Sequence, residues 1–346
     1  MIHFSYANLA WEQASSLLAI DSPSGYTHTA ANWVQMMFEK MGYDPKITTK
    51  GGVLIDLGGA DSDDGLLLEA HTDTLGAMVA QIKGSGRLKL TPLGGMNANN
   101  AEAENVDVYT RSDKIISGTC QLCNASVHVN KDYDSTKRSW DTVEVVLDEE
   151  VSSAEDVRKL GIEVGDIVCF SPRTQRTYSG YLKSRFLDDK LSVGILMAFA
   201  QYLKDRQITP KRRTWIHVTV YEEVGHGGSA SVPAGITEAI SVDMGCVGDG
   251  LQCTERQVSI CAKDSGGPYS YEVVGKLIEA AKKTEADYAV DVYPFYGSDV
   301  ESTLRAGCDI RHGLIGPGVY ASHGYERSHI DGVYNTLKVL CGYLEG

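Results

Sequence analysis

The stretch HTDTLGAMV (residues 71–79) follows the apolar run GLLLEA (residues 65–70) and interrupts it with a histidine, a spacer and an aspartate. The apolar run is typical of a strand buried on both faces of an α/β sheet. A His-x-Asp pair at the end of such a strand is costly to bury unless it is satisfied. Two interpretations are open: Asp73 caps the strand end and starts the next turn, or His71 is a metal ligand whose ring Asp73 orients from behind.

The sequence on either side of this stretch alternates between helical and strand patterns. Residues 27–42 place Ala30, Trp33 and Met37 at helical spacing and end in Gly42, a good C-cap. This alternation predicts an α/β fold, with a mixed sheet flanked by helices. Further helices are expected over residues 190–205, 271–283 and 332–345, and further strands over residues 51–59, 214–223, 239–245 and 288–294.

Between residues 76 and 184 the pattern changes to short alternating strands separated by Gly, Asn and Asp turns. Only residues 153–161 have a helical pattern. No low-complexity tract bounds this segment, so we interpret it as a small β-rich domain inserted into the α/β fold rather than as a linker. The expected organisation is a discontinuous α/β domain, residues 1–75 and 185–346, and an inserted domain, residues 76–184.

The composition limits the classes of function. Hydrophobic residues make up 42% of the 346 residues and charged residues 23%, close to globular averages, so a sizeable core is expected. The formal net charge of −14 argues against nucleic acid or an anionic membrane as the main partner. The N-terminal residues lack the basic start and apolar core of a signal peptide, and no apolar stretch approaches the ~20 residues that span a bilayer. We therefore expect a cytoplasmic protein.

Further acidic and histidine clusters fall at the ends of expected strands or in loops of the α/β part. Ligand-bearing positions in doubly wound sheets gather at the carboxyl ends of the strands, so these clusters are expected to meet in one crevice. Such a density of like charge could not be held there without a cation. The clusters are Asp188 with Asp189, Glu222 with Glu223, Asp243, and His323 with His329.

Two histidines with several carboxylates suit a pair of divalent metals such as zinc, cobalt or manganese. Two such ions share a bridging carboxylate and water, and another carboxylate must stay off the metals to take the proton from that water. Adjacent residues on a strand point to opposite faces, so Glu222 and Glu223 both reach the centre only if the strand ends or twists there. Singly, each cluster also has an ordinary interpretation: Asp188 as part of an N-cap, Asp243 as a turn cap, His323 as a loop histidine.

Taken together, these motifs resemble those of the dinuclear metallo-aminopeptidases that include glutamyl aminopeptidase and the tetrahedral aminopeptidases, metallopeptidase family forty-two. The resemblance covers nearly the whole chain, and the combination of motifs is specific although no single motif is. The motifs that carry it are DSPSGYT (21–27), HTDTLGAMV (71–79), LGIEVGDIV (160–168), LDDK (187–190), EEVGHGG (222–228) and HGYE (323–326).

The resemblance implies a zinc-exopeptidase-like fold and assigns a role to each candidate. It implies that His71 and Asp243 bind different metals, that Asp188 bridges the two, and that Glu223 and His323 complete the ligand set. Glu222 then resembles the general base and Asp73 the residue that orients His71. The implied cofactors are two divalent ions per subunit, most simply zinc, with cobalt or manganese as alternatives. The inserted domain resembles a dimerisation or assembly domain, so a homo-oligomer, either a dimer or a dodecamer, is expected.

The sequence departs from the family pattern around the expected substrate site. Gly227 stands where relatives have an arginine, Gly324 and Tyr325 replace a Ser-Pro pair, and Ser298-Asp299-Val300 replaces Thr-Asp-Ala. These segments line or neighbour the substrate site in relatives, so the preferred side chain cannot be carried over. An exopeptidase must also bind a free α-ammonium group, most simply through a carboxylate such as Asp299 or Asp264, or through a metal.

The leading hypothesis is therefore a metal-dependent aminopeptidase that removes N-terminal residues from short peptides. One alternative is a dinuclear-metal deacylase or carboxypeptidase-like amidohydrolase acting on a small N-acyl substrate. A second is a glycosidase with a carboxylate pair, which needs side chains ~5–9.5 Å apart and no metal. A third is a metal-stabilised scaffold without catalysis, although a structural site has no need of the additional Glu222.

Overall fold

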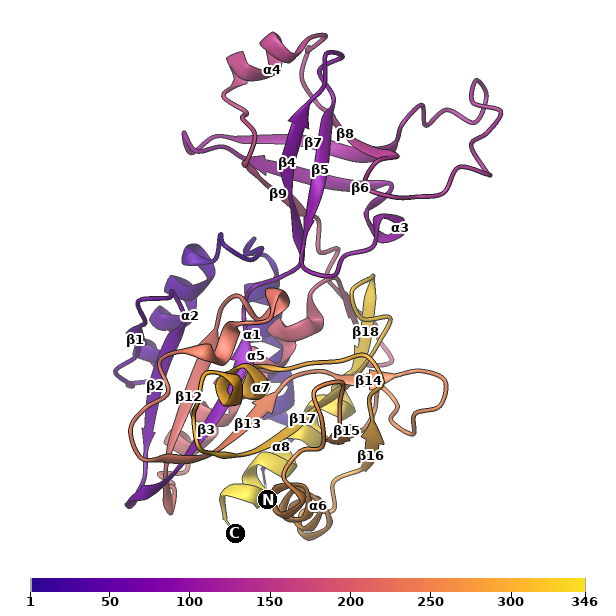
Figure 1. Ribbon diagram of the computed structural model, residues 1–346. Helices are drawn as coiled ribbons and strands as arrows, with labels where there is room; N and C mark the ends of the chain where they lie inside the picture. Colours follow the sequence, from indigo (N-terminus) through magenta and orange to yellow (C-terminus); the bar gives the residue numbers. More distant parts are fainter. Residues whose placement is uncertain (1, 346) are drawn as a thin grey trace. The chain divides into compact units, whose positions relative to one another are not determined.

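The computed structural model describes residues 2–345, apart from the side chain of Ser62. The chain divides into two compact units (Figure 1). The larger unit comprises the residues up to Asp73 and those from Arg173 onward, and the smaller unit comprises Thr74–Pro172. The expected α/β fold with an inserted β-rich domain is confirmed.

The larger unit is built on a mixed sheet of 12 strands. Strand β3 is parallel to its two neighbours β12 and β13, and β13 is in turn parallel to β17. The carboxyl ends of these four strands therefore lie along the same edge of the sheet, where ligand sites of α/β proteins form. The bounds are β3 (Asp61–His71), β12 (Arg212–Thr219), β13 (Ile236–Val242) and β17 (Arg311–Tyr320).

The remaining strands extend the sheet on both sides. On one side β2 pairs antiparallel with β12 and β1 with β2, while on the other β18, β11 and β10 follow β17. Strands β14 and β15 also pair with β17, and β16 pairs with β15. The bounds are β1 (Lys46–Ile47), β2 (Val53–Gly58), β10 (Gln175–Arg176), β11 (Tyr181–Ser184), β14 (Gly245–Val247), β15 (Val258–Lys263), β16 (Tyr288–Val292) and β18 (Glu326–His329).

One boundary of the inserted segment differs from the sequence-based expectation. The sequence predicts that the insertion extends to residue 184, because the α/β pattern returns only after residue 185. In the structure β11 instead pairs antiparallel with β18, with Tyr181 opposite His329, so residues 173–184 belong to the larger unit. Pairing with a strand that lies so far along the chain leaves no local signal in the sequence.

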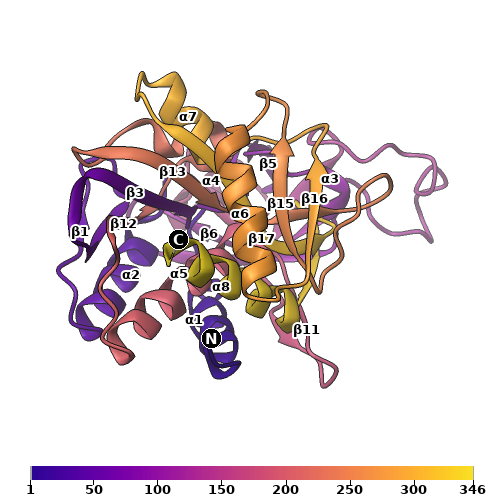
Figure 2. The same cartoon turned by 90° about the horizontal axis from the view of Figure 1, so that it is seen from below.

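Helices cover both faces of the large sheet (Figure 2). Helices α1, α5 and α8 pack together on one face, and α7 lies against β3 and β13 on the other. Helix α5 is buried along nearly its whole length, which explains its continuous apolar sequence. Among the described residues, none of the helices combines the length and the apolar composition that a bilayer crossing requires. The bounds are α1 (Ser5–Leu18), α2 (His28–Lys40), α5 (Leu187–Asp205), α6 (Tyr271–Lys283), α7 (Asp299–Arg305) and α8 (Ile330–Leu344).

The smaller unit is a closed β-barrel with the strand order β4-β5-β8-β7-β6-β9. Strands β6 and β8 alternate buried residues with more accessible ones, as the period-two pattern predicts. Helix α4 begins where expected, because the Ser153 hydroxyl accepts a hydrogen bond from the Asp156 N–H. The bounds are β4 (Gly76–Ile82), β5 (Leu88–Leu93), α3 (Ala98–Ala101), β6 (Glu104–Tyr109), β7 (Ile115–Leu122), β8 (Val143–Leu147), α4 (Ala154–Leu160) and β9 (Ile167–Phe170).

Candidate metal centre

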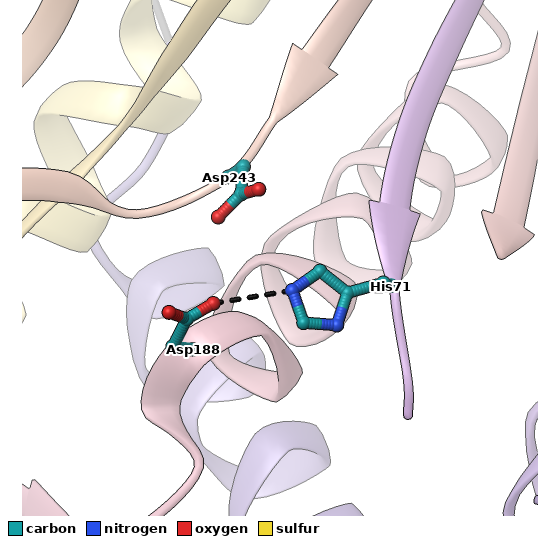
Figure 3. A group of neighbouring side chains, drawn as sticks. All are labelled: His71, Asp188 and Asp243. Carbon is teal, nitrogen blue, oxygen red and sulfur yellow. Dashed lines mark hydrogen bonds and ion pairs between the residues drawn. The ribbon is translucent and has the colours of Figure 1, made fainter. Parts of the chain in front are cut away.

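His71 is the last residue of β3, and Figure 3 shows its ring facing Asp188. A second contact, with Asp73, fixes the ring from the other side. The Nδ1 atom lies 2.9 Å from the backbone carbonyl oxygen of Asp73, which accepts a hydrogen bond from it. The Nε2 atom lies 3.1 Å from Oδ1 of Asp188. A carbonyl that accepts from one ring nitrogen leaves the other nitrogen as the ligand atom. Nε2 is therefore the nitrogen of His71 that can bind a metal.

Asp188 lies between two groups of candidate ligands. In each group the nitrogen and carboxylate oxygen atoms lie within 4.8 Å of one another, and Asp188 belongs to both. The first group is His71, Asp188 and Asp243, and the second is Asp188, Glu223 and His323. This arrangement differs from the expectation that His71 and Asp243 bind different metals. They lie together because β3 and β13 are adjacent parallel strands that end at the same edge.

Both glutamates of the EEVGHGG motif reach the centre because β12 ends before them. The strand ends at Thr219, and residues 222–224 form a short 3-10 turn between Tyr221 and Gly225, both in the left-handed backbone region. Glu222 Oε2 then lies 3.7 Å from His71 Nε2. Glu223 Oε2 lies 3.6 Å from His323 Nε2. The condition inferred from the sequence, that the strand must end here, is thus met.

The carboxylate of Asp73 holds this turn. Its Oδ1 accepts a hydrogen bond from the Glu222 N–H at 3.0 Å and its Oδ2 accepts one from the Glu223 N–H at 3.4 Å. The hydroxyl of Ser24 donates a further hydrogen bond to Oδ2 at 2.5 Å. Asp73 therefore orients His71 mainly through its backbone carbonyl, and it orients both glutamates through its side chain.

The electrostatics of the centre favour a cation. Burial raises the pKa of Glu222 and Glu223 well above the ordinary value and raises that of Asp243 to about 7. Burial alone would raise the pKa of Asp188, but its hydrogen bonds with His323 and His71 lower it instead. The Oε1 atom of Glu223 is buried without a hydrogen-bond partner. A divalent ion would satisfy this oxygen and neutralise the carboxylates, so the residues present fit a metal site.

Two buried acids that the sequence did not assign a role support the ligands. Glu326 accepts hydrogen bonds from the backbone N–H of Asp188 at 3.0 Å and of His323 at 2.9 Å. Asp189 accepts one from the backbone N–H of His71 at 3.3 Å. Both stand inside motifs of the sequence, LDDK and HGYE, and their burial could not be read from those motifs.

Other candidates lie outside the centre. The ring of His329 accepts a hydrogen bond from the Asp331 N–H at the start of α8 and contacts the carbonyl of Ser179, so it supports the fold. Asp264 is fully buried and accepts a hydrogen bond from Tyr269 Oη at 2.6 Å. Asp299 is also buried, with Oδ2 accepting a hydrogen bond from Thr219 Oγ1.

The metal centre opens into a cavity of about 430 Å³. The side chain of Phe295, at its wall, is 93% exposed and offers an apolar surface beside the ligands. The candidate ligands that line the cavity are Asp188, Glu223, Asp243 and His323, joined by Glu222.

Comparison with known proteins identifies the family. A family model described as M42 glutamyl aminopeptidase matches residues 51–339. The chain belongs to this M42 peptidase family. It is 40% identical over 334 residues to YhfE of Bacillus subtilis (strain 168), whose name assigns it provisionally to the aminopeptidases, and the match covers 96% of each chain. It is also 23% identical to the lysyl aminopeptidase of Pyrococcus furiosus, covering 68% of this chain and 65% of that protein.

Solved structures agree with the M42 assignment at the level of the fold. The aminopeptidase APDkam598 from the archaeon Desulfurococcus kamchatkensis matches with a TM-score of 0.88 at 21% identity, covering 98% of this chain and 95% of that one. A Pyrococcus horikoshii TET1 peptidase matches with a TM-score of 0.85 at 20% identity, covering 97% of this chain and 99% of that one. That peptidase is described as assembling into a tetrahedron or a large octahedral shell. The M42 assignment makes this chain a peptide hydrolase.

Proposed function

We propose that this protein is a dinuclear metal-dependent aminopeptidase that removes N-terminal residues from short peptides. The observation that carries the proposal is the position of Asp188, which is shared by two groups of candidate ligands beside a further carboxylate, Glu222. A shared carboxylate is the feature that joins two metal ions in one catalytic centre. The ions are most simply zinc, with cobalt or manganese as alternatives.

The candidate ligands would divide between two ions according to the two groups described above. His71 and Asp243 would hold one ion, Glu223 and His323 would hold the other, and Asp188 would bridge them. Two bound divalent ions would polarise the scissile carbonyl and lower the pKa of water. Asp73, Glu326 and the Asp189 carboxylate keep the ligand-bearing segments in place through the hydrogen bonds described above.

We assign the proton transfer of the reaction to Glu222. Its carboxylate lies on the wall of the larger cavity, outside both ligand groups and fixed through its backbone by Asp73. In this position it takes the proton from the attacking water and gives it to the leaving amine, the task of a general base that becomes a general acid. Asp299, buried beside Glu222 at the same site, is the carboxylate that we assign to the substrate's α-ammonium group.

The smaller unit has a proposed role in assembly. It is a closed barrel with its own buried core and none of the candidate ligands. We assign this barrel to contacts between subunits of a homo-oligomer, either a dimer or a dodecamer. Light scattering of the purified protein distinguishes the two, and a monomer at all concentrations would contradict the assignment.

The experiment that tests the function is hydrolysis of aminoacyl p-nitroanilides by the chelated protein, before and after zinc, cobalt or manganese is added back. We expect activity only with metal, only on substrates with a free α-amine, and with two equivalents of metal per subunit. N-acetylated anilides are the matched control. Hydrolysis of the N-acyl substrates alone would favour the deacylase alternative, and activity unaffected by chelation would refute the metal-dependent mechanism.

A further inference from the structure

A second cavity, of about 180 Å³, adjoins the metal centre. It shares Glu222, Gly225, Tyr296 and Gly297 with the larger cavity, so the two meet at the general base. Its volume suits a single side chain rather than a length of peptide. A substrate whose first carbonyl lies at the metal centre can therefore extend one side chain past Glu222 into this space.

Two glycines in the wall of this cavity leave space for the carboxylates beside them. A Cβ atom at Gly227 would collide with Oδ1 of Asp299, and a Cβ atom at Gly266 would collide with both carboxylate oxygens of Glu301. All four residues line the cavity. The absence of side chains at the two glycines thus leaves room for the acids, and gives the small cavity a negatively charged lining.

Within this lining the carboxylates outnumber the cationic side chains. The Oδ1 atom of Asp299 has no hydrogen-bond partner, and the residue is only 3% exposed. Glu301 is paired through Oε2 with Arg305 at 2.9 Å, but the side chain of Arg305 is 68% exposed and can turn into solvent. Arg305 is the only cationic side chain among the described residues that line the cavity, against the carboxylates of Glu222, Asp299 and Glu301.

A further buried carboxyl stands behind Glu301. Asp264 is fully buried, and it accepts hydrogen bonds from Tyr269 Oη and from the Gly266 N–H. Burial and a hydrogen bond with Asp264 raise the pKa of Glu301 to about 7. Asp264 and Glu301 are neighbouring acids and repel each other when both are ionised. An additional cation in the cavity would reduce that repulsion.

We propose that this cavity binds the side chain of the first substrate residue and selects the cationic side chains of lysine and arginine, with Glu301 as the residue that binds the terminal cation. The inference rests on the proposed aminopeptidase function and names its substrate class. Charge-assisted hydrogen bonds to a buried carboxylate give strong discrimination against neutral side chains of similar size. With Asp299 occupied by the α-ammonium group, acidic side chains would still meet the carboxylates of Glu222 and Glu301 and are excluded by repulsion.

The test compares kcat/KM for lysyl, arginyl, leucyl and glutamyl p-nitroanilides on the zinc-loaded enzyme. We expect the wild-type protein to prefer the lysyl and arginyl substrates. In Glu301→Gln the ratio of lysyl to leucyl kcat/KM falls by about 10–100-fold, through KM more than kcat, because one charge-assisted hydrogen bond is lost. Glu301→Asp, which keeps the charge, retains part of the preference.

Glu272→Gln is the matched control. Glu272 also stands in a helix and pairs with a cation four residues later, Lys276, at 2.8 Å, but it lies away from the cavity. The ratio of lysyl to leucyl kcat/KM in Glu272→Gln is expected to remain at the wild-type value. A wild-type preference for leucyl or glutamyl substrates, or an unchanged ratio in Glu301→Gln, overturns the inference while leaving the aminopeptidase function standing. If none of the free-amine p-nitroanilides is hydrolysed, the aminopeptidase function itself is refuted, and the inference with it.

Discussion

At the scale of single residues, Glu222 and Glu223 show how neighbours in sequence receive different tasks. The 3-10 turn points one carboxylate toward His71 and the other toward His323. Asp73 holds the backbone N–H groups of both glutamates, so a change in either side chain leaves the turn in place. The two roles can therefore be separated by mutation.

We expect Glu222→Gln to keep its metal and lose turnover. Glutamine has nearly the same shape as glutamate but cannot accept and return a proton, a function that contributes typically 10²–10⁴-fold to the rate. Elemental analysis should find wild-type metal content, with kcat reduced by about a hundredfold or more. Glu223→Gln is the companion variant and should lose metal as well as activity. Normal turnover by metal-loaded Glu222→Gln would rule out the assignment of the base.

The candidate residues could be recognised from sequence, but their grouping could not. A His-x-Asp pair after a buried strand and a Glu-Glu pair before glycines are local patterns. Whether His71 shares an ion with Asp243 depends on which strands are neighbours, and β3 and β13 are separated by nearly half of the chain. Asp189 and Glu326 were missed as supporting residues for the same reason, because each accepts a hydrogen bond from a backbone N–H that is distant in sequence, that of His71 and that of Asp188.

At the scale of elements, the amino-terminal ends of the parallel strands carry a buried ionic cluster. Glu238 of β13 is fully buried and accepts hydrogen bonds from Arg212 of β12 at 2.6 Å and from Tyr343 of α8 at 2.6 Å. Arg311 of β17 lies 3.3 Å from its other oxygen. One carboxylate therefore joins three strands and a helix at the end of the sheet opposite the metal centre.

We expect Glu238→Gln to lower the free energy of unfolding by about 2 kcal/mol, because a buried carboxylate loses the charge of its hydrogen bonds with Arg212 and Tyr343. Burial alone would raise the pKa of Glu238, but hydrogen bonds from Tyr343 and Arg212 outweigh it and hold the pKa below its ordinary value. This stabilisation is present above the ordinary pKa of ~4.3 and is lost as the pH falls through the lowered folded pKa. Urea unfolding at pH 7 and below pH 4 measures the difference.

The exposed residue Glu12 provides the control for this prediction. Glu12→Gln should leave the free energy of unfolding within ~0.5 kcal/mol of the wild-type value. The two proteins should differ less in free energy of unfolding as the pH falls. If the difference between Glu238→Gln and wild type instead grows toward acid pH, the assigned direction of the pKa shift is wrong.

The helices and most strands follow from sequence periodicity, whereas β17 does not. Its sequence, RHGLIGPGVY, contains three glycines and a proline, which normally indicate a turn. A Cβ atom at Gly316 would collide with the carbonyl oxygen of Asp243, and one at Gly318 with that of Thr254. The glycines are required by close backbone approach in the middle of the sheet, and only the tertiary structure reveals that requirement.

At the scale of the whole molecule, the metal centre joins segments that are distant in sequence. Its ligands follow β3, β12, β13 and β17 or begin α5. Ions that bind the folded state alone stabilise it by an amount that grows with metal concentration, about 4 kcal/mol at a thousandfold excess over the Kd.

We therefore expect chelation to lower the Tm of the larger unit and zinc to restore it in a concentration-dependent way. Differential scanning calorimetry measures the shift, and Asp188→Asn should be insensitive to added zinc because it removes the shared ligand. A Tm unaffected by metal in the wild-type protein would show that the carboxylates are held by the fold alone.

The barrel lies in sequence between the first and second candidate ligands, His71 and Asp188, and the last ligand is His323. During synthesis the sequence of the barrel is complete once Pro172 has been added, but the set of candidate ligands is incomplete until His323 has been added. If the proposed ligand set is correct, the complete metal centre can form only after His323 has been synthesised. Under the proposed function, a nascent chain that still lacks His323 would lack one of the metal ligands and would not hydrolyse the peptides around it.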